Sequence, residues 1–226
     1  MSHAIIRRLA IPAIVSLLVV LPACNMPTQA AVMIPDPVVD SPLAAAKGEQ
    51  TTVLAGGCFW GIQAVYEHVK GVISATAGYC GGSADTANYE TVSSGETGHA
   101  ESVRVVYDPS QVSFGQLLKV FFSVAHNPTE LNRQGPDTGT QYRSVIFCAT
   151  DEQTKIAKAY IAQLDDARVF SRRIVTQVVS LNAFYPAEGY HQDYAAHHPD
   201  QPYIYINDLP KVANLRKQLP NLYVGK

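Results

Sequence analysis

The sequence predicts an α+β domain made of two layers, one of helices and one of β-sheet. From residue 51 onward, stretches with the alternating apolar pattern of strands are interspersed with stretches that have helical spacing. They do not follow the regular strand–helix–strand repetition of parallel-sheet proteins, and the sequence contains no internal repeat. The chain has 226 residues, of which 47% are hydrophobic, so it can build one such domain with a sizeable core and an appendage.

The first strand and helix of this domain should meet at a glycine-rich turn. Residues 51–54 are β-branched or apolar, which favours a short strand, and the apolar residues of 62–69 recur at helical spacing. The turn between them reads Ala55-Gly56-Gly57-Cys58-Phe59-Trp60-Gly61. Cys58 should therefore lie near the first residues of the helix.

The later elements follow from the same two periodicities. We expect strands at residues 72–79, 101–107, 144–148 and 174–180, and helices following a cap at Ser113, at 151–164 and at 209–219. Residues 88–94 should form a loop or a single turn, and residues 126–141 a long polar loop.

The front of the chain has the features of an export signal. Arg7 and Arg8 precede an apolar run at residues 9–21, which is too short for a comfortable membrane span. The run ends in Leu21-Pro22-Ala23-Cys24, which is similar to a bacterial lipoprotein box, in which the cysteine is lipidated and becomes the new N-terminus. The alternative is a cut after Thr28-Gln29-Ala30, which would release a soluble protein without Cys24.

These features predict three parts of the chain. Residues 1–23 would be the signal peptide, residues 24–48, rich in Pro and Ala, a tether, and residues 49–226 the folded domain. A lipid on Cys24 would anchor the protein to a bacterial membrane. We therefore expect an exported protein of the periplasm or cell envelope.

Charge and cysteine usage exclude other classes. The formal net charge is −2 and no basic stripe is present, which argues against a nucleic-acid partner. The cysteines are Cys24, Cys58, Cys80 and Cys148, without a C-x-x-C pair. Neither a disulfide framework nor a zinc site is indicated.

Cys58 is the main candidate for chemistry. A helix N-terminus gathers unpaired N–H groups and the positive end of the helix dipole, so a thiol there should lose its proton more easily than a free thiol. Phe59 and Trp60, the single tryptophan, place aromatic faces beside the sulfur. The alternative is a small buried cysteine packed with two core aromatics.

Further polar groups lie where a core does not need them. Glu101 follows Gly98-His99-Ala100 at the start of a strand, and Tyr89 follows Asn88. Asp137 and Tyr142 belong to a glycine-rich loop, a kind of segment that often carries function. Singly, each has a simpler explanation: a charge at a strand edge for Glu101, a turn former for Asp137, and half-buried aromatics for the two phenols.

Taken together, these segments resemble the A-type peptide methionine sulfoxide reductases. The resemblance extends in order from about residue 53 to 223. It rests on Gly57-Cys58-Phe59-Trp60-Gly61, Gly98-His99-Ala100-Glu101, Asn132-Arg133-Gln134-Gly135-Pro136-Asp137, Gly139-Thr140-Gln141-Tyr142-Arg143-Ser144 and Tyr190-His191-Gln192-Asp193-Tyr194.

The resemblance implies an enzyme that reduces the S epimer of methionine sulfoxide, free or in proteins. It also implies a mixed central sheet with a ferredoxin-like core and long loops around the active site, with no metal and no bound cofactor. Cys58 would attack the sulfoxide sulfur and become a sulfenic acid, while Glu101 would donate a proton to the oxygen.

The resemblance also assigns the substrate-binding residues. Phe59 and Trp60 would hold the sulfoxide methyl group, and Tyr89 and Tyr142 would join Glu101 around the oxygen. Asp137 would orient this network or assist the later reduction. The substrate would be an oxidised envelope protein or free methionine sulfoxide, and the enzyme a monomer.

The cysteine pattern departs from many relatives, which carry further cysteines near the C-terminus. Here no cysteine follows Cys148, which lies in the apolar run Val145-Ile146-Phe147 and should be a packing residue. Cys80 lies in a glycine-rich turn that could be exposed, and is the candidate for an internal resolving thiol. The leading hypothesis is a one-cysteine cycle in which an outside reductant, a thioredoxin-like protein or a small dithiol, restores Cys58.

Two other functions remain as alternatives. A thiol hydrolase would pair Cys58 with a histidine such as His99 as base. A non-enzymatic metal binder would use His191, His197 and His198, although the residues around His198 look more like the end of a helix.

Overall fold

The computed structural model describes Met1 and residues 34–225. Residues 34–225 belong to one compact unit. The predictions of a signal peptide at 1–23 and of lipidation at Cys24 lie outside the described residues. Within 34–225, every helix is too short or too polar to cross a membrane.

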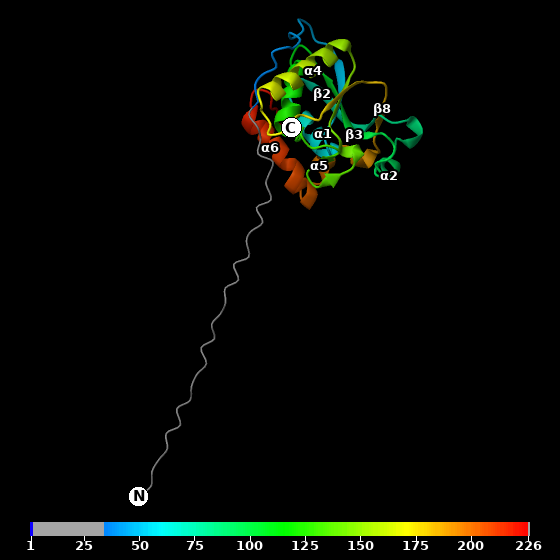
Figure 1. Cartoon of the computed structure of the whole chain (residues 1–226), viewed down its shortest axis with the longest axis vertical. Helices are drawn as coiled ribbons and strands as arrows, with labels where there is room; N and C mark the ends of the chain where they lie inside the picture. The colour runs from blue at the N-terminus through cyan, green and yellow to red at the C-terminus, as the bar shows by residue number, and fades with distance from the viewer. Residues whose placement is uncertain (2–33, 226) are drawn as a thin grey trace. The chain divides into compact units, whose positions relative to one another are not determined.

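A six-stranded sheet forms one layer of this unit (Figure 1). Its strands are β1 Gln50–Ala55, β2 Val72–Cys80, β3 Ala100–Tyr107, β6 Val145–Cys148, β7 Gln177–Ser180 and β8 Phe184–Pro186, in the order β7-β6-β1-β3-β2-β8. β6 and β7 are parallel, and the other neighbouring strands are antiparallel. The sheet is therefore mixed, and the prediction of an α+β fold is confirmed.

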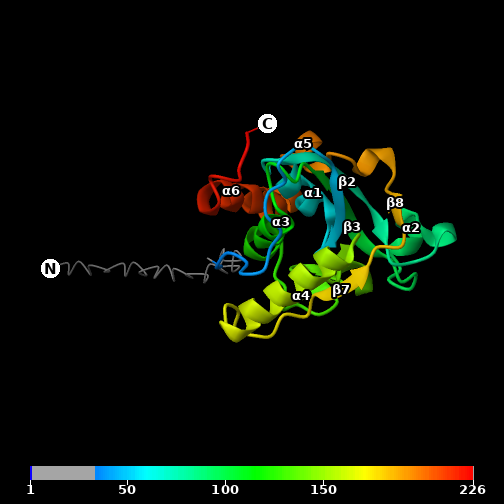
Figure 2. The same ribbon diagram turned by 90° about the horizontal axis from the view of Figure 1, so that it is seen from above.

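Helices form the second layer. The main ones are α1 Phe59–Glu67, α3 Phe114–Val120, α4 Asp151–Asp166 and α6 Leu209–Gln218. In Figure 2, α1, α3 and α6 lie on the same side of β2 and β3. Leu54, Val103 and Ile146 of the sheet pack there with Ile62 of α1 and Leu117 of α3, which makes the main core. Because alternate strand residues point to opposite faces, Val53, Ala55 and Phe147 form a second, smaller cluster on the other face.

Short elements complete the fold and carry the loops around its centre. They are η1 Ala84–Thr86, α2 Tyr89–Val92, η2 Phe121–Ala125, β4 Arg133–Gln134, β5 Asp137–Thr138, η3 Thr140–Tyr142, η4 Gly189–His191, α5 Tyr194–His197 and η5 Ile204–Asp208, with η2 and η5 π-helical.

The expected elements lie at the expected places. Ser113 caps α3 as predicted, in a reciprocal pair of hydrogen bonds with Gln116. The sequence did not predict β8 or the β4–β5 hairpin, because two- and three-residue strands are too short to show a period. It did indicate a helix end near His198, and α5 ends at His197.

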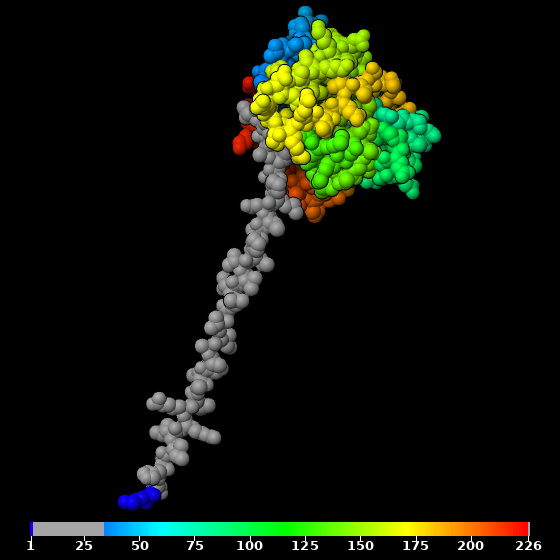
Figure 3. Space-filling model, viewed as in Figure 1, coloured from blue at the N-terminus to red at the C-terminus, as the bar shows by residue number. Residues whose placement is uncertain are grey.

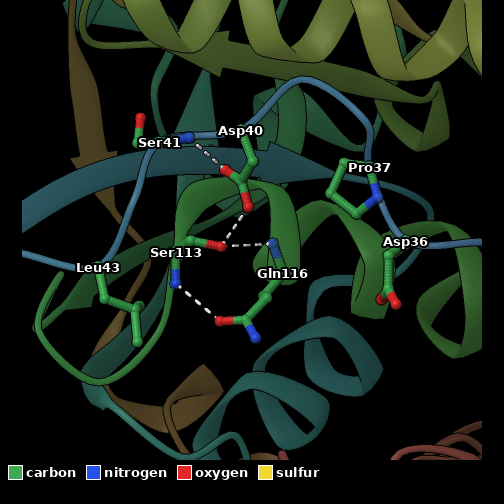
Figure 4. Close-up of a pocket in the computed structure, with 7 residues that line it drawn as sticks. All are labelled: Asp36, Pro37, Asp40, Ser41, Leu43, Ser113 and Gln116. Atoms are coloured by element: carbon green, nitrogen blue, oxygen red, sulfur yellow. Dashed lines mark hydrogen bonds between the residues drawn. The ribbon is translucent and has the colours of Figure 1, made fainter.

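Residues 34–48, the described part of the predicted tether, lie against the domain. Figure 3 shows this segment on the surface beside α4. Asp40 accepts a hydrogen bond from the Gly115 N–H at the start of α3, at 2.8 Å, and a further bond joins it to Ser113 (Figure 4). Tyr160 of α4 donates to the Pro35 carbonyl at 2.6 Å. Residues 34–48 therefore differ from a free tether, because their polar groups form hydrogen bonds with α3 and α4 that the amino-acid composition of the segment does not reveal.

Candidate active site

The turn between β1 and α1 places Cys58 at the N-cap position of the helix, as the sequence predicts. Gly57 has a φ of +98°, a conformation that favours glycine. A Cβ there would lie 2.6 Å from Cγ of Gln134, and one on Gly56 would lie 2.8 Å from the His126 ring. Both glycines are therefore needed for the backbone to reach Cys58, whose side chain is 8% exposed.

Glu101 brings a buried carboxyl group to the same point from the neighbouring strand β3. It is 3% exposed, accepts a hydrogen bond from the Phe59 N–H at 3.1 Å, and lies close enough to Cys58 for the thiol to affect its pKa. Burial raises the pKa of Glu101 to about 8, the Phe59 N–H lowers it in part, and the nearby charge of Asp137 raises it further. Glu101 therefore carries a proton at neutral pH.

Cys58 is a neutral thiol in this environment. Burial raises the pKa of Cys58 well above its ordinary value, and the charges of Glu101 and Asp208 add to the shift. The backbone N–H of Trp60 and the Lys211 ammonium lower the pKa of Cys58, but their effects are smaller. The expectation of an acidified thiol is therefore wrong, because desolvation and two carboxyl groups outweigh the helix terminus.

Cys58 belongs to a core cluster that contains Phe59, and Trp60 packs against this cluster. The Trp60 ring is half-buried and stacks on Tyr194 with centroids 3.9 Å apart, and its Nε1 donates to Nδ1 of His191 at 3.2 Å. The Phe59 ring is fully buried, 5.0 Å from the His191 ring. The two predicted aromatic residues thus border Cys58, and α5 and η4 fix their orientation.

The two predicted phenols lie close enough to Cys58 and Glu101 to interact with them electrostatically. Tyr89 begins α2 and is 36% exposed, while Tyr142 ends η3 and is half-buried. Burial raises the pKa of both phenols, and the charges of Glu101 and Cys58 contribute to each shift. Both phenols therefore keep their protons and can donate hydrogen bonds to an oxygen held between them.

Asp137 has a partner that the sequence did not reveal. Its Oδ2 accepts a short hydrogen bond from the Tyr203 hydroxyl. Burial raises the pKa of Asp137, and this hydrogen bond lowers it in part. Asp137 therefore holds Tyr203, which itself interacts with Cys58.

Residues 50–222 match the family model of the peptide methionine sulfoxide reductases. The chain belongs to this family. A relative from Mesorhizobium japonicum, described as "Peptide methionine sulfoxide reductase MsrA 2", is 59% identical over 182 residues, which cover 80% of this chain and 93% of the relative. A second "MsrA 2", from Synechocystis sp., is 54% identical and covers 82% and 88%.

Solved structures of the family have a similar fold. The reduced form of Mxr1 from Saccharomyces cerevisiae has a TM-score of 0.61 and 32% identity, over 71% of this chain and 91% of that one. Methionine sulfoxide reductase A of Corynebacterium diphtheriae has a TM-score of 0.58 and 36% identity, over 69% and 77%.

Cys80 and Cys148 are both buried in this reductase. The expectation of an exposed Cys80 is wrong: the residue ends β2, is 1% exposed, and donates from Sγ to the Ala183 carbonyl at 3.0 Å. Tyr79 pairs with Glu101 across the strands, so Cys80, the next residue, points to the opposite sheet face. Burial raises the pKa of Cys80 to about 12. Cys148 lies in the main core, in agreement with a packing role.

The histidines have other partners. His99 accepts from the Gly82 N–H at 3.2 Å through Nδ1, and its Nε2 lies 2.9 Å from the Ser83 carbonyl oxygen. Both ring nitrogens are thus occupied, and His99 offers no base for a hydrolase. His191 is 2% exposed and is held by Trp60. Residues 34–225 bring no three metal-ligating side chains together.

Proposed function

We propose that this chain reduces the S epimer of methionine sulfoxide, free or in proteins, to methionine, with Cys58 as the thiol that is oxidised. The observation that carries the proposal is the buried Glu101 carboxyl beside Cys58, which accepts a hydrogen bond from the Phe59 N–H and whose pKa burial raises to about 8. A sulfoxide oxygen needs a proton as its bond to sulfur breaks, and a shielded carboxylic acid can supply it. Family membership supports the same reaction.

The proposed first step balances without an outside proton. Sγ of Cys58 attacks the sulfoxide sulfur as Glu101 protonates the oxygen. The oxygen then bonds to Sγ as its bond to the substrate sulfur breaks, the sulfur–sulfur contact opens, and methionine leaves. The thiol proton of Cys58 replaces the one that Glu101 gave. Two electrons pass from the Cys58 sulfur to the substrate sulfur, so that a thiol and a sulfoxide become a sulfenic acid and a thioether.

Binding of the sulfoxide group would use both sides of the site. The Phe59 and Trp60 rings accept the methyl group, since moving an apolar methyl from water to an aromatic surface lowers the free energy. Tyr89 and Tyr142 donate hydrogen bonds to the oxygen. Asp137 acts indirectly, by orienting the Tyr203 hydroxyl toward the site.

Return of Cys58 to the thiol would use a reductant from outside the chain. Cys80 and Cys148 are buried, and Cys80 lies on the far face of the sheet. The sulfenic acid reacts with one outside thiol to form a mixed disulfide and water, and a second thiol then releases Cys58. The reductant is a thioredoxin-like protein or a small dithiol, and neither a metal nor a bound cofactor takes part.

An assay on both epimers tests this function. The wild type should form methionine from the S epimer and leave the R epimer unchanged, while Cys58→Ser should form none. A variant without this sulfur that still reduced the S epimer would refute the proposal. Cleavage of a peptide bond in place of sulfoxide reduction would favour the hydrolase.

The proposal extends to location and architecture. The basic and apolar residues before Cys24 support export to the periplasm or cell envelope, with a lipid on Cys24 as the membrane anchor and oxidised envelope proteins as substrates. The order β6-β1-β3-β2, together with α1 and α3 between strands, supports a ferredoxin-like core. We also propose that the enzyme acts as a monomer.

A further inference from the structure

A buried ion pair lies beside Cys58 that the proposed reaction does not use. Asp208 ends η5 and is 0% exposed, and its Oδ1 accepts from Nζ of Lys211 on α6 at 3.1 Å. The Lys211 side chain is 15% exposed. Both groups act electrostatically on Cys58.

The first turn of α1 is shaped around this pair. A Cβ on Gly61 would overlap Oδ1 of Asp208 and lie 2.6 Å from Nζ of Lys211. Glycine inside a helix costs about 0.5 to 1 kcal/mol relative to alanine. Gly61 therefore lets the two charges approach the helix three residues after Cys58.

Stability alone does not explain the pair. Within the described residues, Oδ2 of Asp208 is buried and has no hydrogen-bond partner. A carboxylate that is buried with one unsatisfied oxygen is costly, and a buried ion pair is often no more stable than apolar residues of similar volume. A group kept at such a cost next to a reactive sulfur points to a role in its chemistry.

We propose that Asp208 and Lys211 form a positioning pair that sets how readily Cys58 gives up its proton in the first step. This inference rests on the proposed function for its place in the cycle. Asp208 holds Cys58 in the thiol form while the site is empty, and Lys211 limits that effect so that the sulfur stays available for attack. Neither residue touches the substrate.

Other groups facing Cys58 set the background against which the pair acts. Glu101 on β3 adds a carboxyl group, and Tyr89, Tyr142 and Tyr203 add phenols from α2, η3 and the start of η5. The phenols stay neutral because burial raises the pKa of each. Lys211 is the positive charge among the described groups that act on Cys58.

The test follows the rate at which iodoacetamide alkylates Cys58 between pH 6 and about 11, with peptide mass spectrometry to assign the labelled cysteine. Asp208→Asn removes the negative charge and leaves Lys211, so the pKa of Cys58 should fall and alkylation at a given pH should be about tenfold faster. Adding Lys211→Met to Asp208→Asn removes the remaining cation, and the rate should drop severalfold below that of Asp208→Asn. Lys217→Met, on the exposed face of the same helix, should match the wild type.

Faster alkylation of Cys58 in Asp208→Asn, followed by slower alkylation when Lys211→Met is added, is a result that a merely structural role would not give. An unchanged profile in Asp208→Asn, or a further acceleration when Lys211 is also replaced, would overturn the proposal. Asp208→Ser removes the same charge with a smaller side chain, and it carries the same prediction if the asparagine variant fails to fold. Alkylation needs no sulfoxide, so failure of the proposed function would appear separately, as a wild type that forms no methionine.

Discussion

Replacing Glu101 by glutamine should slow sulfoxide reduction while leaving Cys58 more reactive toward other reagents. The amide keeps an oxygen that can accept the Phe59 N–H bond but has no acidic proton for the sulfoxide. Loss of a general acid lowers a rate by about 10²- to 10⁴-fold. Above about pH 8, where Glu101 is ionised, its charge also raises the pKa of Cys58, so its removal should lower that pKa and speed alkylation there.

The rate of the first step should fall as pH rises, because Glu101 loses the proton that it donates. Glu101 acts only when protonated, and its pKa is about 8. The wild-type rate should therefore be nearly constant from pH 6 to about 7 and fall about tenfold per unit well above pH 8. Glu101→Gln should lack this descending limb, because it has no group that titrates there.

A single-turnover assay measures this step, with the S epimer in excess and no reductant, by the burst of methionine. Glu96→Gln, an exposed glutamate exchanged in the same way, is the control and should behave as wild type. Unchanged turnover of Glu101→Gln at neutral pH would refute the role of Glu101 as the acid. Slower alkylation together with slower reduction would indicate a damaged site instead.

Folding stability should change with pH for the same reason, and four other variants test separate parts of the mechanism and fold. The pKa of Glu101 is raised from 4.5 to about 8, so the wild type loses stability as pH rises between these values. In urea unfolding at pH 8, Glu101→Gln should lack this loss, which is on the order of a few kcal/mol. Parallel plots of unfolding free energy against pH for both proteins would contradict this. Cys80→Ser and Cys148→Ser should each turn over repeatedly with dithiothreitol, whereas a single burst from Cys80→Ser would make Cys80 the resolving thiol. Trp60→Phe loses the bond to His191 and part of the stack on Tyr194, so its KM for the S epimer should rise severalfold more than its kcat falls, and a drop in kcat alone would argue against a binding role. Asp40→Ala should cost about 1 kcal/mol of unfolding free energy by removing an acceptor at the start of α3, which a change below the error of urea titration would disprove.

The sequence predicts the centre of the site because that part is local. The turn from β1 to α1 shows in the change of apolar period and in the glycines, which place Cys58 at the helix start. Glu101 is the second residue of β3, and a strand beginning shows in the alternation that follows it. Both positions along the chain depend on short stretches, so the sequence predicts them. That the two side chains meet is implied only by the family resemblance, because it depends on the pairing of β1 with β3.

The remaining features depend on tertiary packing. Tyr203 and Asp208 reach the site through the π-helical turn η5, a conformation without a sequence period, and Asp208 beside Pro210 reads only as a helix start. The protonation of Cys58 depends on how much water the fold excludes. The place of Cys80 depends on where β2 ends. The strand includes Cys80, and because successive strand residues point to opposite faces, the Cys80 side chain lies on the far face of the sheet.

The most direct test is to follow Cys58 itself through one turnover with the S epimer in the absence of reductant. We predict one equivalent of methionine per chain and one added oxygen on Cys58, trapped as a sulfenic acid by dimedone and assigned by peptide mass spectrometry. Methionine formed while Cys58 stays unmodified, or a trapped oxygen on another cysteine, would contradict it.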